Sequence, residues 1–213
     1  YQTAQNTFQT IYGNAHPKLA LVTLNMGAVA WFMDNRPDAL TKLQQVATIE
    51  EANLTTFLNQ IGDENRKQAY IQSLQGSLDL ILSFHLNQPS DNVPAAELAL
   101  TTILQRKGRV LDALSNTVAL LRQRLTPTIQ ATFDQLSEKR SQLASLSFRG
   151  PGNAPLGTYK QQLASLNQDI QKLESQLSNQ SAEFRTESQP ITVAAVQNLL
   201  PQDSALLEYI VYN

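Results

Sequence analysis

The chain has 213 residues, which is enough for one large domain or two small ones with a sizeable core. Its formal net charge is −2 and only 16% of its residues are charged. A protein that neutralises many phosphates is usually strongly basic, so this balance argues against a dedicated nucleic-acid binder. The absence of cysteine excludes disulfides, thiolate zinc sites and a cysteine nucleophile within the chain, and it fits the cytoplasmic location that we expect. No apolar run approaches the roughly 20 residues needed to span a bilayer.

Glycine and proline cut the first part of the chain into helical blocks. Residues 1–12 have the character of a helix that ends at the turn formed by residues 13–17. Residues 18–33 are apolar on nearly all sides, which predicts a helix packed on two faces. Residues 37–60 carry apolar side chains at three-and-four spacing, and Gly62 is expected to stop that helix.

The middle of the chain predicts two more long helices. Asp63 is a plausible N-cap for a helix over residues 64–87, and the segment 89–94 is a clear break. Residues 95–124 form the second block, with Gly108 in its interior. Because an interior glycine costs about 1 kcal/mol relative to alanine, we expect a close helix crossing or a local bend there.

The third part predicts an antiparallel helical hairpin. A helix over residues 128–147 and a helix over residues 158–184 flank a loop at 149–157 that is rich in glycine and proline. The second helix has the a/d spacing of a coiled coil, with Leu163, Leu166, Ile170, Leu173 and Leu177. This stripe is either the seam of the hairpin itself or a dimer zipper.

Near its end the pattern changes. Thr192 is placed to cap a short helix through Leu200, and residues 205–212 carry the one good strand signal in the sequence. A lone strand leaves its backbone groups without partners, so we expect its sheet to lie beyond Asn213.

The sequence therefore predicts an all-α fold with one C-terminal β-strand that belongs to another domain. We divide it into helix pairs at 1–60, a long-helix linker at 61–125, a hairpin at 126–188, and a short helix with the strand at 189–213.

Three stretches resemble a known family. Tyr1-Gln2-Thr3-Ala4 through Gly13-Asn14-Ala15-His16-Pro17 resembles the second helix and connector of a kinesin-light-chain type of tetratricopeptide repeat. Gly27 and Pro37 stand where the next repeat usually has leucine and an aromatic residue, as in a degenerate last repeat. The run Leu-Thr-Thr-Ile-Leu-Gln-Arg-Lys-Gly-Arg at 100–109 and the segment 181–212 resemble the helical linker and the first strand of the CHAT domain in bacterial repeat–CHAT proteins.

CHAT domains are caspase-like cysteine proteases with a His/Cys catalytic pair, and neither member can be placed here. The chain has no cysteine, and His16 and His85 precede the CHAT-like strand. We expect His16 to belong to the repeat connector and His85 to the core or a groove. No set of residues at metal-ligand spacing accompanies them, and we expect no cofactor.

The resemblance implies a non-catalytic protein–protein interaction and regulatory arm of a CHAT protease. Its partners would be a protein or peptide on the helical-repeat surface and its own CHAT domain. The alternative is a purely structural helical scaffold in a multiprotein assembly; an enzyme within the chain itself has little support.

The candidate docking residues are basic or aromatic. Arg106, Lys107 and Arg109 form the most basic stretch, which is either a docking patch for an acidic partner or the CHAT domain, or a solvated helix face. Trp31, in the repeat-like part, is the fourth candidate.

Overall fold

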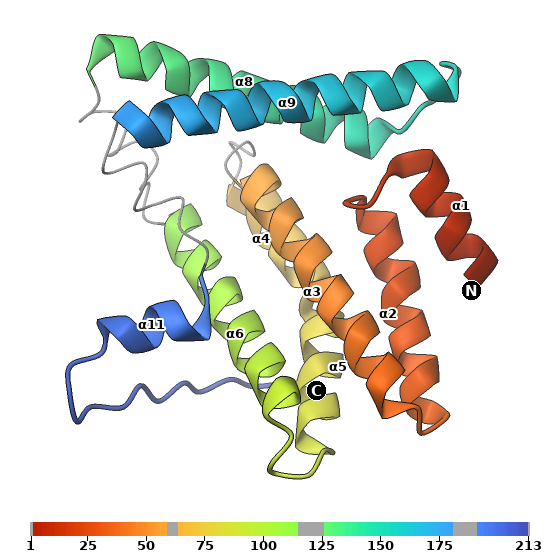
Figure 1. The fold of residues 1–213 in the computed structure, drawn as a ribbon, viewed down its shortest axis with the longest axis vertical. Coiled ribbons are helices and arrows are strands. Elements are labelled where there is room, and N and C mark those ends of the chain that lie inside the picture. The colour runs from red at the N-terminus through yellow and green to blue at the C-terminus, as the bar shows by residue number, and fades with distance from the viewer. Residues whose placement is uncertain (1, 59–63, 115–125, 181–190, 213) are drawn as a thin grey trace.

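Figure 1 shows the fold in a computed structural model, which is described for residues 2–58, 64–114, 126–180 and 191–212. The side chains of 55–68 and 109–125 are also outside this description. Within these ranges the fold is all-α, with nine helices: α1 (Gln2–Tyr12), α2 (Pro17–Phe32), α3 (Arg36–Leu58), α4 (Glu64–Ser73), α5 (Gln75–Leu86), α6 (Val93–Leu114), α8 (Pro127–Arg149), α9 (Leu156–Gln180) and α11 (Val193–Leu199). None of the described helices is long and apolar enough to cross a membrane.

Helices α2 and α3 form an antiparallel pair with a close approach (Figure 1). Gly27 lies at that approach: a Cβ atom there would sit 3.2 Å from the Cβ of Lys42 and 3.4 Å from Cδ2 of Leu43. A larger side chain such as leucine at this position would not fit between the two helices without a shift. The turn between the helices closes at Asp34 (φ 56°), and the Asn35 side chain accepts a hydrogen bond from the Asp38 N–H at the start of α3.

The main core lies between α2, α3, α5 and α6. Its buried members are Ala30, Ala39, Leu43, Leu78, Ile81, Leu82, Phe84, Ala95, Leu98, Ala99 and Ile103. Trp31 packs edge-on against Phe84, with ring centroids 5.6 Å apart and planes at 82°. These contacts account for part of the apolar surface of α2, since one face packs against α3 and another reaches α5, whereas Leu21 and Phe32 are exposed.

The predicted helix over residues 64–87 is wrong as a single element, because the structure breaks it into α4 and α5 at Leu74. The Leu74 N–H donates to the Ile71 carbonyl, and the Ser73 hydroxyl donates to the Tyr70 carbonyl. Hydroxyl groups that bond nearby carbonyls compete with the helical ladder, and Gly76 follows at once. The other long helices match their predictions over the described residues; the ends predicted at 59–60, 115–124 and 181–184 lie outside them.

Helices α8 and α9 form the predicted antiparallel hairpin, which lies across one end of the helical body (Figure 1). Gly150 ends α8 with a φ of 68°, a conformation that favours glycine. The seam buries Phe133, Leu136, Ile170 and Leu177 between the two helices. The leucine stripe of α9 thus packs against α8 within the chain.

The predicted C-terminal strand is not found: the described residues contain no β-strand, and residues 205–212 run as extended chain. A strand needs a neighbour to satisfy its backbone groups, and no described segment pairs with this one. The short helix before it is confirmed, since the Thr192 hydroxyl accepts from the Ala195 N–H at 3.1 Å at the start of α11.

Candidate functional site

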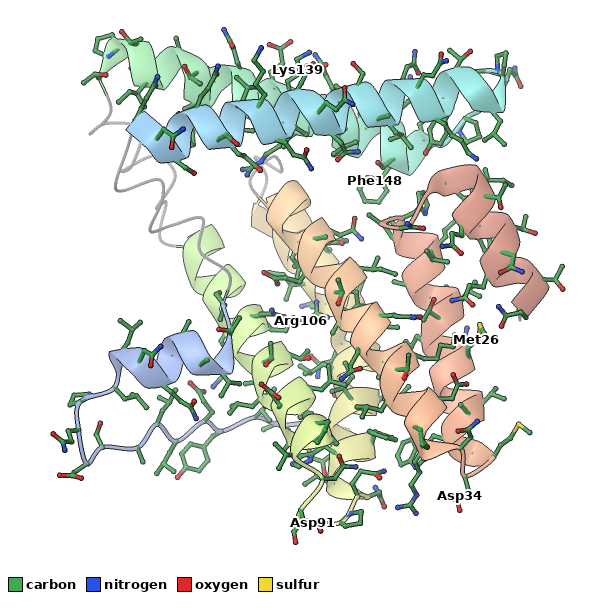
Figure 2. All side chains as sticks on the ribbon, in the orientation of Figure 1. Met26, Asp34, Asp91, Arg106, Lys139 and Phe148 are labelled. Carbon is green, nitrogen blue, oxygen red and sulfur yellow. The ribbon has the colours of Figure 1, made fainter. Side chains whose placement is uncertain are left out.

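A buried polar cluster joins three helices of the body. Glu50 of α3, Ser77 of α5 and Arg106 of α6 are 7%, 3% and 8% exposed. The Arg106 Nη2 forms an ion pair with Oε2 of Glu50, and the Ser77 hydroxyl donates to the same oxygen at 2.7 Å. Figure 2 labels Arg106 where α6 faces α3. Because each helix supplies one member, the cluster fixes how the three helices pack.

The electrostatics of the cluster are those of a structural ion pair. Burial raises the pKa of the Glu50 carboxyl, and the Arg106 charge and the Ser77 hydrogen bond oppose that rise. Burial and the Glu50 charge also raise the pKa of the nearby Tyr70. Nη1 of Arg106 has no hydrogen-bond partner among the described residues. The pair therefore holds two charges in place at a considerable desolvation cost.

A second group of polar contacts holds the C-terminal segment, residues 205–212, against α6. The Lys107 ammonium pairs with the Glu208 carboxylate and donates to the Tyr209 carbonyl at 3.1 Å. Two residues earlier on α6, the Gln105 amide donates to the Ile191 carbonyl at 3.2 Å. The Ile191 side chain lies over Gly108, where an added Cβ would stand only 2.6 Å from its Cδ1. Gly108 therefore marks a close approach to α6 of the Ile191 side chain, which precedes α11 and does not belong to a crossing helix.

The docked segment alternates like a strand. Glu208 and Ile210 are half-buried, and Ile210 packs against the main core. Leu207, Tyr209 and Val211 are exposed to 74%, 83% and 90%. This period of two places one face of the segment on the helices and leaves an apolar face uncovered.

The structure separates the four candidate docking residues. Arg106 is buried in its ion pair, and Lys107 bonds to the chain's own C-terminal segment. The side chain of Arg109 lies outside the described residues. Trp31 is half-buried against Phe84, at the edge of the main core. Arg106 and Lys107 thus do not share one surface, because neighbours on a helix point in different directions.

The described residues do not place either histidine in a cluster of metal-ligating side chains. His85 has a buried Nδ1 without a hydrogen bond, and His16 caps α2. Among the described residues no group of three or more His, Cys, Asp and Glu side chains could hold a metal ion. Sequence reasoning missed Glu50, Ser77 and Glu208, because their partners lie 27 to 101 residues away along the chain.

Comparison of the chain with protein-family models, with curated proteins and with solved structures finds no match. The fold of the described residues is all-helical and contains antiparallel helix pairs.

We predict that removing either member of the buried ion pair destabilises the fold unequally. Glu50→Leu should lower the free energy of unfolding by about 3–5 kcal/mol, because it leaves a buried arginine that cannot lose its charge. Arg106→Met should lower the free energy of unfolding by less at acidic pH than at neutral pH, because the Glu50 carboxyl left without its partner can take up a proton. A carboxyl whose pKa is raised by folding adds stability as the pH falls below that pKa.

Urea unfolding at neutral and acidic pH measures both effects. The double variant Glu50→Leu with Arg106→Met should recover much of the loss, because no unpaired charge remains. Equal losses for the two single variants at every pH would contradict this view of the pair.

We predict that Lys107→Glu frees the C-terminal segment without unfolding the body. The side chains of Lys107 and Glu208 are 42% and 22% exposed, so global stability should change by less than about 1 kcal/mol. Cleavage by chymotrypsin after Tyr209 should become several-fold faster, because cleavage needs the segment to detach.

The reversed pair, Lys107→Glu with Glu208→Lys, should restore slow cleavage. Lys139→Glu breaks the 2.7 Å pair with Asp169 on the hairpin and serves as the matched control. Wild-type cleavage rates in Lys107→Glu would show that the ion pair does not hold the segment.

Proposed function

We propose that this chain is a non-catalytic interaction and regulatory arm that fixes a caspase-like CHAT domain to tetratricopeptide-like helices. The observation that carries the proposal is the strand-like segment at 205–212, anchored to α6 on one side and apolar on the other. The stretches at 100–109 and 205–212, which resemble the CHAT linker and first strand, supply the two sides of this contact.

An exposed apolar strand is a liability in water, because its free edge and its side chains invite pairing. A sheet that accepts residues 205–212 would satisfy the backbone groups and cover Leu207, Tyr209 and Val211. In the proposal that sheet belongs to the CHAT domain, and the arm sets its position.

The packing offers a route by which a partner would influence the domain. A protein or peptide bound on α1–α3 would press on α3, whose Glu50 is paired with Arg106 of α6. The next residue of α6, Lys107, holds the strand-like segment. A change in the α3–α6 packing would thus reach the segment through two adjacent residues, which supports the regulatory part of the proposal.

The experiment uses the natural polypeptide that carries this sequence. Hydrolysis of a fluorogenic peptide library is compared between wild type, Tyr209→Asp and Val211→Asp. Both side chains are exposed within the chain, so the helical body should tolerate the changes. We expect hydrolysis to fall at least about tenfold, because a charge at a covered strand position is costly to bury.

Phe32→Asp is the matched control, because Phe32 is 93% exposed and lies outside the segment. Equal activity in all four proteins would overturn the role of the segment. If even the wild-type polypeptide hydrolyses nothing, the protease arm is wrong and the structural scaffold becomes the better account.

A further inference from the structure

His16 joins the helical body to the hairpin through both ring nitrogens. Nδ1 accepts a hydrogen bond from the Lys18 N–H at 3.0 Å, which caps α2. Nε2 lies 2.7 Å from the carbonyl oxygen of Ser147, in the last turn of α8. A carbonyl can only accept, so the proton lies on Nε2 and the ring is neutral. The side chain is 4% exposed.

The contact between hairpin and body is lightly packed. The main core and the small cluster of Leu19, Ala20 and Ile49 belong to the body, and the seam cluster belongs to the hairpin; none of these three clusters of described residues crosses between them. A cavity of about 420 Å³ lies there instead, lined in part by Tyr12, His16, Asn53, Ser147 and Lys160. Because no core cluster crosses this contact, its polar contacts contribute to holding the hairpin against the body.

Aromatic contacts surround the histidine. The Tyr12 ring lies over it, with centroids 4.4 Å apart. Tyr12 also approaches Gly150, where an added Cβ would be 2.8 Å from Cε1 of the tyrosine. Figure 2 shows Phe148 on the side of the hairpin that faces the body, whereas Lys139 lies on the far side. His16 thus sits inside the contact and is covered by the hairpin.

We propose that His16 is a pH-sensitive latch that holds the hairpin α8–α9 against the helical body while its ring is neutral and releases it on protonation. A proton on Nδ1 would point at the Lys18 N–H and break the cap. Among the residues that line the contact and are described, none is a carboxylate that could pair with an imidazolium, so the protonated ring would recover its hydration by leaving the contact.

The charged groups around the ring are mostly cationic. Lys18 follows on α2 and Lys160 of α9 lines the cavity. Tyr12 of α1 and Tyr159 of α9 are neutral phenols at physiological pH. The α3 carboxylates, Glu50 and Glu51, are not among the residues that line the cavity.

Burial lowers the pKa of His16 below its ordinary value of 6.5, and Lys18 lowers it further, although the bond to the Ser147 carbonyl opposes the change. A histidine whose pKa is lowered by docking stabilises the docked form above pH 6.5. That stabilisation is lost as the pH falls below this value. For each pH unit by which docking lowers the pKa of His16, protonation of the ring weakens docking about tenfold.

The absence of cysteine allows a specific test. Asn6→Cys and Asn153→Cys place spin labels at exposed positions on α1 and on the hairpin turn. Electron–electron double resonance should give one narrow distance at about pH 7.5 and a broad, longer distribution at about pH 5. An unchanged distribution between the two pH values would overturn the latch.

Three variants separate the latch from other titrations. His16→Gln keeps a donor for Ser147 without a titratable ring, so the docked distance should persist at both pH values. His16→Asn keeps an N-cap but is too short to reach Ser147, so the narrow distance should be lost even at neutral pH while helicity by circular dichroism is kept. His85→Gln should respond to pH like the parent. A parent-like pH response in His16→Gln would refute the proposal.

Discussion

The ion pair between Glu50 and Arg106 is the constraint on which the helical body depends. It places a positive and a negative charge in the space where α3, α5 and α6 meet, and Ser77 completes the acceptor's hydrogen bonding. Both charges are buried, so the three helices pack in an arrangement that lets the two side chains pair. The orientation of α6 follows, and with it the direction in which Lys107 points.

The orientation of α6 determines where the C-terminal segment docks. Lys107 and Gln105 reach residues on either side of α11, and Gly108 lets Ile191 approach the helix. The same short stretch of α6 therefore serves the core on one side and the docked segment on the other. The hairpin is joined differently: it has its own seam, and His16 is its most buried polar link to the body.

The helices could be predicted from the sequence where the hydrophobic spacing and the positions of glycine and proline agree. The spacing of Leu163 to Leu177 and the loop at 149–157 specify the hairpin, because both its period and its turn are local. The break at Leu74 was missed, since it involves the Ser73 hydroxyl, which donates to the nearby Tyr70 carbonyl. Such bonds leave little trace in hydrophobic periodicity.

The candidate site was harder to predict for a physical reason. Arg106 and Lys107 are adjacent basic residues, and both residue types are usually exposed to solvent. Arg106 is buried because it pairs with Glu50, and Lys107 is half-exposed because it pairs with Glu208; both partners are distant in the sequence. Residues 205–212 have the composition of a strand, but a strand also requires a neighbour, which composition does not supply. The alternation of exposed and half-buried residues there agrees with the pattern even though no ladder forms.

The proposal that this chain is the arm of a CHAT protease is tested most directly by the intact mass of the natural polypeptide from its source cells, with sequencing of its C-terminal part. The account predicts a mass well above 23.6 kDa and a histidine and a cysteine in the sequence that follows Asn213. A mass near 23.6 kDa would contradict it, because the exposed face of residues 207–211 would then have no sheet within its own chain to join.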